Sequence, residues 1–125
     1  MFKKKNFTFY KSIEECLKKK KINVAIFSGS LQYTEKPYKV LKKITKSKID
    51  HILLHGIPFN KTKEDQYRVQ YVPKKIYDAS YPITIFSFNL FNSFLKKNNY
   101  KILSTINLRN QFYNIKFKSI IIQKM

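Results

Sequence analysis

Two histidines are the side chains best suited to acid–base chemistry near neutral pH, because histidine titrates closest to that range. His55 directly follows the apolar run Ile52–Leu54, so we expect it at the end of a strand. A residue placed there can act as a general base toward a substrate hydroxyl, and the alternative is a loop histidine without a role. His51 is expected to be structural. On an extended strand the two rings would be about 13 Å apart, which excludes one shared metal ion.

A polar segment follows the apolar run Val24–Phe27 and contains Ser28, Gly29, Ser30 and Gln32. Ligands of open α/β sheets bind beyond the carboxyl ends of the strands, where this segment is expected. These residues are therefore candidates for a ligand-binding crevice. The alternative is that Gly29 only permits a tight turn with positive φ.

Tyrosines are frequent in the segment between Pro58 and Tyr81. Among them, Tyr77 and Tyr81, together with Ser80, are candidates for a substrate pocket, because tyrosine offers both stacking area and a hydroxyl. The alternative is a loop held against the sheet by aromatic packing. A connection of this length within a small domain is usually functional or disordered, and its aromatic content favours an ordered one.

The composition indicates one small domain with an unusual charge. The chain has 125 residues, 26 basic and 7 acidic, for a formal net charge of +19. Such an excess favours nucleic acid or an anionic membrane as a partner. The alternative is genomic bias toward AT-rich codons, since Arg68 and Arg109 are the only arginines and Asn, Ile, Phe and Tyr are also abundant. Nucleic-acid recognition favours arginine, so nucleic acid is the less favoured partner.

The cysteine content and the hydropathy further limit the kinds of site and the cellular location that we expect. Cys16 is the only cysteine, which excludes an intrachain disulfide and a multi-cysteine metal site, and no other metal site is expected. No run of about 18 apolar residues is present, so no membrane span is expected. We also find no signal peptide and expect a cytoplasmic protein.

Apolar runs and capping residues predict an α/β domain. Ser12, Thr34 and Ser87 are expected to cap three helices. The expected strands are Phe7–Tyr10, Ile22–Phe27, Asp50–His55, Tyr100–Ile106 and Ile115–Gln123.

The arrangement of these strands can also be predicted. The unbroken apolar run in Ile22–Phe27 is typical of a strand buried on both faces. With the next helix and Asp50–His55 it forms a parallel, right-handed βαβ unit. A short strand around Val69–Val72 is expected before Pro73. The last two strands are expected to form an antiparallel hairpin at the end of the sheet.

Two motifs carry a resemblance to a known family. The segments are Ser28–Tyr38 (SGSLQYTEKPY) and Glu64–Pro82 (EDQYRVQYVPKKIYDASYP), followed by Phe86 and Ser87. They resemble a family of bacterial class I S-adenosylmethionine-dependent methyltransferases found near surface-polysaccharide genes. The resemblance extends from about Phe7 onward. It implies the later half of a Rossmann-like sheet of order 3-2-1-4-5-7-6 with strand 7 antiparallel, so the expected strands 3-4-5-6-7 form one partial domain, 1–125.

The resemblance also implies a function. S-adenosylmethionine would be the cofactor, Ser28, Gly29, Ser30 and Gln32 would lie beside its methionine part, and the acceptor would be unknown, with a sugar hydroxyl as one option. Where the family has Asp-Arg-Thr-Pro after strand 5, this chain has His55-Gly56-Ile57-Pro58.

Strands 1 and 2, the glycine-rich loop and the acid that holds the ribose are absent from the sequence. We therefore expect a truncated or split methyltransferase that is inactive alone. It would be complemented by an N-terminal polypeptide, or would associate with itself, through the exposed edge of strand 4. The alternatives are a small basic nucleic-acid-binding module and a scaffold or interaction protein.

Overall fold

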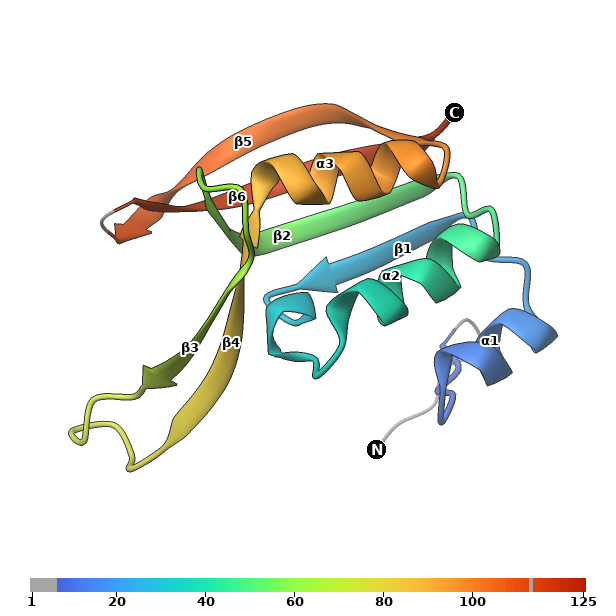
Figure 1. Cartoon of the computed structure of the whole chain (residues 1–125). Coiled ribbons are helices and arrows are strands. Elements are labelled where there is room, and N and C mark those ends of the chain that lie inside the picture. Colours follow the sequence, from blue (N-terminus) through green and yellow to red (C-terminus); the bar gives the residue numbers. More distant parts are fainter. Residues whose placement is uncertain (1–6, 113) are drawn as a thin grey trace.

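The computed structural model describes residues 7–112 and 114–125, without the side chains of 109–112. Its elements, in chain order, are α1 (Ile13–Lys19), β1 (Val24–Ser28), the 3₁₀-helix η1 (Leu31–Tyr33), α2 (Pro37–Lys46), β2 (His51–Asn60), β3 (Gln66–Tyr71), β4 (Ser80–Ser87), α3 (Phe88–Lys97), β5 (Tyr100–Phe112) and β6 (Ile115–Lys124). Figure 1 shows them.

The main sheet has the predicted strand order. β1 pairs in parallel with β2, with Val24 opposite His51 and Ser28 opposite His55. β2 pairs antiparallel with β6, and β6 pairs antiparallel with β5, so the final hairpin joins the sheet through its last strand. The order β1-β2-β6-β5 confirms the prediction for strands 4-5-7-6, including the antiparallel strand 7.

β2 is longer than the predicted strand Asp50–His55 and carries an irregularity between Leu54 and Ile57. Gly56 lies within it with a φ of 69°, a left-handed conformation that glycine adopts without steric cost. Beyond this point β2 pairs in parallel with β4 through Phe59 and Asn60.

The segment expected to be a long connection is mainly a β-hairpin. β3 pairs antiparallel with β4 from Gln66 opposite Ile85 to Tyr71 opposite Ser80. Pro82 therefore lies inside β4, opposite Val69, rather than in a loop. The outer part of this hairpin extends away from the body of the protein (Figure 1). The prediction of a short strand around Val69 is confirmed, but the strand begins at Gln66 and ends at Tyr71.

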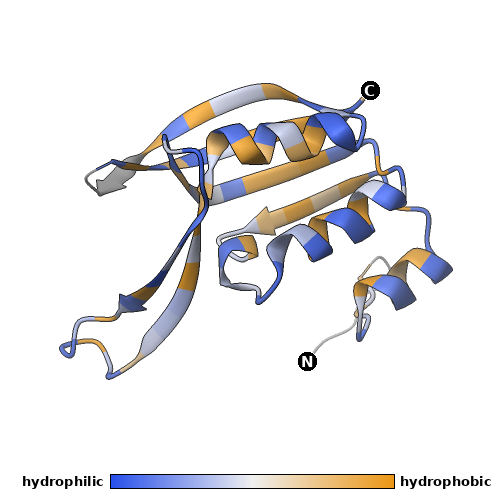
Figure 2. Ribbon diagram, viewed as in Figure 1, coloured by the Kyte–Doolittle hydropathy of each residue, from blue (hydrophilic) through white to orange (hydrophobic). Residues whose placement is uncertain are grey.

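All three α-helices lie on one side of the main sheet (Figure 1). α2 and α3 bury their apolar faces, which are visible in Figure 2, in the same core cluster. That cluster contains Leu41, Ile44, Phe91 and Leu95 from the helices and Ile52, Leu54, Ile120 and Ile122 from the strands. Burying each such side chain contributes roughly 1.5–3 kcal/mol, so this face supplies most of the hydrophobic stabilisation.

Two predicted capping residues are confirmed. Ser12 accepts a hydrogen bond from the Glu15 backbone at 3.1 Å at the start of α1. Ser87 accepts one from the Leu90 backbone at 3.3 Å at the start of α3.

Three local predictions are wrong. Phe7–Tyr10 is not a strand, because no neighbouring strand of the described chain pairs with it. Thr34 does not cap α2, which starts at Pro37 after Lys36. The fixed φ of proline suits the first helical position, and the Thr34 hydroxyl instead donates to the Leu31 carbonyl oxygen at 2.8 Å, closing η1.

The third error concerns β1, which is buried on one face only. Ala25 and Phe27 pack against the core, whereas Val24 and Ile26 are 43% and 68% exposed. The reason is that every helix of the described chain lies on the other side of the sheet. No helix within residues 7–112 and 114–125 has the length and apolar content to cross a membrane.

Candidate functional site

An open cavity of about 360 Å³ lies at the carboxyl end of β1, beside the irregularity in the middle of β2. The residues that line it are Gly29, Gln32, Tyr33, His55, Gly56, Leu108 and Phe117. Three of the predicted site residues therefore meet there: Gly29 from the turn after β1, Gln32 from η1 and His55 from β2. This is the edge at which open α/β sheets bind ligands.

The two glycines shape this end of the sheet. Gly29 has a φ of 57°, and its backbone N–H donates to the His55 carbonyl oxygen at 2.8 Å. An added Cβ at Gly29 or Gly56 would contact nothing within 4 Å, so positive φ alone favours glycine there. Gly29 therefore forms the tight turn that was given as its alternative role. This turn borders the cavity.

Gln32 is a buried polar residue of the site, with 4% of its surface exposed. Its Nε2 donates to the Gly56 carbonyl oxygen at 2.9 Å. This bond fastens η1 to the bend in β2, so Gln32 forms a fixed wall of the cavity.

His55 is exposed, and its Nδ1 lies 2.6 Å from Oγ of Ser119 on β6. If Nδ1 carries the proton and donates to Ser119, then Nε2 is unprotonated and can accept a proton. The role of His55 as a general base stays a prediction.

Ser28 and Ser30 lie beside the cavity but do not line it. Ser28 is the exposed last residue of β1. Ser30 is exposed, precedes η1, and makes no side-chain capping bond. Their predicted contact with a ligand stays a prediction.

Tyr33 connects the cavity with the β3–β4 hairpin. Its hydroxyl donates to Oε1 of Gln70 at 2.6 Å, and its ring packs edge-on against Tyr81 with centroids 6.3 Å apart. The Tyr81 hydroxyl donates to the Tyr77 hydroxyl at 3.2 Å, a hydrogen bond that raises the pKa of Tyr81. Tyr81 and Tyr77 are thus joined to the site through Tyr33. Ser80 lies opposite Tyr71 at the outer end of β4 and is exposed.

A second cavity of about 440 Å³ lies between η1 and the hairpin and shares Gln32 and Tyr33 with the first. Its other lining residues are Thr34, Glu35, Tyr67, Arg68, Val69, Pro82, Ile83 and Thr84. Tyr33, Tyr67 and Arg68 were not among the predicted site residues. The signal available was their place in the two motifs, which the hairpin brings together.

The motif residue Asp65 has a structural function at the junction of β4 and α3. It accepts hydrogen bonds from the Ser87 backbone at 2.7 Å and from the Tyr38 hydroxyl at 3.4 Å. Burial and the nearby Asp65 carboxylate raise the pKa of Tyr38. Part of the long motif therefore secures the hairpin to α2 and α3.

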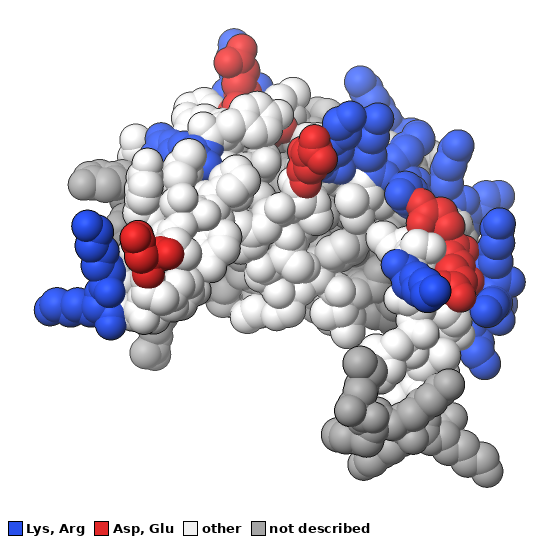
Figure 3. All heavy atoms as spheres, turned by 90° about the horizontal axis from the view of Figure 1, so that it is seen from below, with Lys and Arg blue, Asp and Glu red and all other residues white. Residues whose placement is uncertain are grey.

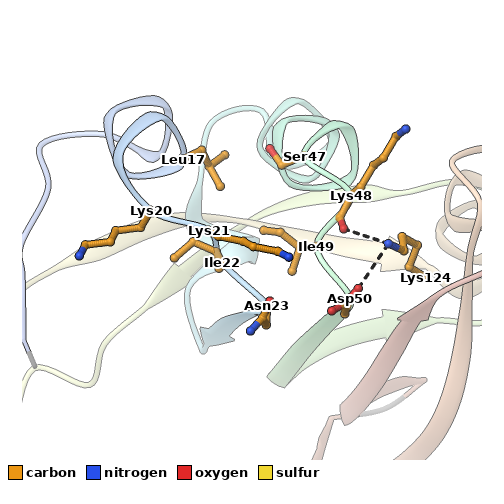
Figure 4. Close-up of a pocket in the computed structure, with 10 residues that line it drawn as sticks. All are labelled: Leu17, Lys20, Lys21, Ile22, Asn23, Ser47, Lys48, Ile49, Asp50 and Lys124. Carbon is orange, nitrogen blue, oxygen red and sulfur yellow. Dashed lines mark hydrogen bonds and ion pairs between the residues drawn. The ribbon is translucent and has the colours of Figure 1, made fainter.

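A further cavity, of about 430 Å³, lies at the opposite, amino ends of β1 and β2 (Figure 4). Four lysines line it, and Lys124 contacts Asp50 at 3.3 Å and the Lys48 carbonyl oxygen at 3.4 Å. Lys20, Lys21 and Lys48 follow the carboxyl ends of α1 and α2, where cations offset the helix dipoles. We assign no ligand to this cavity.

Comparison with known proteins gives structural matches only. No family model and no curated protein matches the chain. One similar solved structure is the Burkholderia thailandensis 1,6-didemethyltoxoflavin-N1-methyltransferase with bound 1,6-didemethyltoxoflavin and S-adenosylhomocysteine. Its TM-score is 0.53 at 9% identity, and the match covers 82% of this chain and 43% of that one.

Another is the N-terminal domain of EvdMO1 in the presence of S-adenosylhomocysteine and D-fucose. Its TM-score is 0.50 at 9% identity, covering 82% of this chain and 46% of that one. This chain thus spans less than half the length of the solved structures it matches. The chain shares the Rossmann-like α/β fold of these structures, which confirms the predicted fold class.

Proposed function

We propose that this chain serves in methyl transfer from S-adenosylmethionine to a hydroxylated acceptor, and that it forms the acceptor side of the site. The observation that carries the proposal is the open cavity at the carboxyl end of β1, beside the bend in β2, and the two similar solved structures are both described with S-adenosylhomocysteine. The chain accounts for less than half of those structures. It offers no glycine-rich loop, because its only glycines are Gly29 and Gly56.

The residues of the cavity suit part of the cofactor. S-adenosylmethionine supplies an activated methyl group on sulfur. Gly29 and Gln32 would lie beside its methionine part, with Ser28 and Ser30 at the rim. A left-handed turn without a Cβ allows close approach of a ligand to the backbone. His55 would take the proton of the acceptor hydroxyl through Nε2, with Ser119 holding its tautomer. Catalysis would otherwise depend on holding the reacting groups in line.

For the acceptor we propose a sugar, held in the second cavity against the hairpin. Tyr33 and Tyr67 line that cavity with aromatic surface, and Arg68 and Glu35 line it with charged groups. Apolar ring faces and polar groups together suit the alternating faces and hydroxyls of a sugar. The D-fucose present with one structural neighbour and the resemblance of the motifs support the same choice. Tyr77, Ser80 and Tyr81 would form the outer part of this surface.

We further propose that the isolated chain is inactive, because the main cofactor contacts are missing. The test is an amide NMR titration of the isotope-labelled chain with S-adenosylhomocysteine. We expect weak binding, with a Kd of about 1 mM, and shifts centred on Gly29, Gln32 and Gly56. Lys48 and Asp50 at the opposite end of the strands serve as the control.

Two results would refute the cofactor site. One is chemical-shift changes confined to the lysine-lined cavity at the amino ends of β1 and β2. The other is no chemical-shift change at millimolar ligand. Micromolar binding of S-adenosylmethionine in calorimetry would be compatible with the cofactor site. It would refute the proposal that cofactor binding depends on a complementing polypeptide.

A further inference from the structure

One face of the main sheet carries large apolar side chains and no helix. Strand register places Ile26 opposite Leu53, and Leu53 opposite Ile121, so these three side chains lie on the same face. We call this the open face, and its apolar residues are Val24, Ile26, Leu53, Ile106 and Ile121. Ile26 and Ile106 are 68% and 59% exposed, and no described residue packs over them as α2 and α3 do on the other face.

A bare face of this kind is unusual for parallel strands. β1, β2 and β4 pair in parallel, and parallel sheets occur almost only with both faces covered by helices. The sequence of β1 agrees with that rule, because Val24 and Ile26 are large apolar residues on the uncovered side. Contiguous exposed apolar surface marks an interaction site.

The open face is continuous with an unpaired strand edge. Among the described strands, β1 pairs with β2 alone, so one of its edges presents free backbone N–H and C=O groups. Such an edge is a template for another strand. Val24 and Ile26 belong to both features, so one partner could pair with the edge and cover the face.

The charge of the chain distinguishes between two occupants. A second copy would bring together two chains of net charge +19, and it would offer a sheet face rather than helices. Figure 3 shows a largely uncharged middle on the side seen from below, with most lysine and arginine side chains on the right of the view, a few on the left, and aspartate and glutamate side chains among them. Basic residues outnumber acidic ones by 26 to 7 in the chain, and this excess fits an acidic partner.

We propose that the open face and the free edge of β1 bind a separate acidic α/β polypeptide. It adds a parallel strand to β1 and covers Val24, Ile26 and Leu53 with helices. The binding surface does not depend on methyl transfer. If the proposed function also holds, this polypeptide supplies the cofactor contacts that the chain lacks.

The experiment is co-expression of the tagged full chain with each polypeptide encoded by the genes that adjoin its own. We expect one acidic polypeptide to form a complex of one copy each, measured by light scattering. Hydrogen exchange should then slow at the β1 amides and not at the β3–β4 hairpin.

Two isoleucines provide a matched pair of variants. Ile26 on the open face and Ile76 in the hairpin loop are 68% and 67% exposed. Ile26→Lys should weaken the complex at least about tenfold, and Ile76→Lys less than about twofold. Both substitutions are at exposed sites, and circular dichroism checks that both variants fold.

Three results would overturn the proposal. One is that no adjoining gene product binds. Another is a complex that leaves β1 exchange unchanged or responds equally to both variants. The last is self-association of the chain that Ile26→Lys abolishes, which would identify a second copy as the occupant. None of these results depends on cofactor binding, so failure here is separate from failure of the proposed function.

Discussion

At the scale of single residues, the candidate site depends on a few polar contacts that hold η1 and the turn before it against the bend in β2. Gln32 is buried and donates to the Gly56 carbonyl oxygen. Gly29 donates to the His55 carbonyl oxygen. His55 in turn contacts Ser119 on the neighbouring strand. These contacts bring residues from three separate parts of the chain to one cavity.

Gln32→Leu should lower the free energy of unfolding by about 1–3 kcal/mol, because it leaves the partly buried carbonyl oxygen of Gly56 without its donor. Urea denaturation measures the change. Gln70→Leu is the control, since Gln70 is exposed and accepts only from Tyr33, so its effect should stay within about 0.5 kcal/mol. Equal losses in the two variants would contradict a structural role for the buried amide.

His55→Gln should reduce methyl transfer by the complemented enzyme by about 10²–10⁴-fold, the usual contribution of a general base. His51→Gln is the matched control, because His51 lies on the same strand four residues earlier, near its amino end. Its rate should change less than about threefold. A His55→Gln variant with the unaltered rate would exclude His55 from proton transfer.

At the scale of elements, the inner end of the β3–β4 hairpin is fixed to the core by several hydrogen bonds and aromatic contacts. Asp65 accepts from the Ser87 backbone and from the Tyr38 hydroxyl. The Ser87 hydroxyl donates to the Thr62 carbonyl oxygen at 2.7 Å. The Tyr38 ring packs against Phe86 and Phe94, with centroids 5.8 and 5.1 Å away. This junction therefore aligns α2, α3 and the inner part of the hairpin.

Tyr38 should make the fold sensitive to alkali. Burial and Asp65 raise its pKa in the folded state, so the folded state retains the phenol proton more strongly than the unfolded chain does. The stability from this group is complete below the unfolded pKa of about 10 and is lost as the pH rises above it. Tyr38→Phe should therefore flatten the fall in unfolding free energy between about pH 8 and about pH 10.5.

Urea denaturation at both pH values measures this slope. Tyr71→Phe is the control, because Tyr71 is 76% exposed, and it should keep the slope of the parent protein. Tyr100 is left in place in both variants, since burial and Asp50 raise its pKa as well. A parent slope retained in Tyr38→Phe would show that other groups cause the alkaline loss.

At the scale of the whole molecule, positive charge is in large excess and little of it is neutralised. The chain has 26 basic and 7 acidic residues, and three ion pairs join such groups within the described residues: Lys19–Glu15, Lys43–Glu14 and Lys124–Asp50. Lys118 lies close to other positive charges. Burial and the nearby Lys116 and Lys61 lower its pKa. Self-repulsion of this kind opposes the compact state.

Added salt should therefore stabilise the protein. Raising sodium chloride from about 20 mM to about 500 mM shortens the screening length to a few ångströms, so repulsion between surface lysines should weaken. We expect Tm to rise by about 4 °C for each kcal/mol gained. Differential scanning calorimetry measures the shift. A Tm that falls with salt would indicate that the ion pairs outweigh the repulsion.

The sequence by itself determined the class of fold and much of the site. Apolar runs and capping residues located β1, β2, β5, β6 and α3, since burial and capping are local preferences of the chain. The motifs predicted the strand order, including the antiparallel last strand. Gly29, Gln32 and His55 were each predicted at or beyond the end of a strand, and they line one cavity, although β2 continues past His55 to Asn60.

The tertiary structure alone decided which surfaces are paired and which are open. Phe7–Tyr10 has a strand-like pattern but no strand beside it, and the tyrosine-rich segment became a hairpin that places Tyr33 beside Tyr81. Val24 and Ile26 have the pattern of a strand buried on both faces, yet they are exposed. The apolar pattern of a segment indicates which side chains favour burial. Burial also requires a helix or strand that packs over those side chains, and no short stretch of sequence specifies that partner.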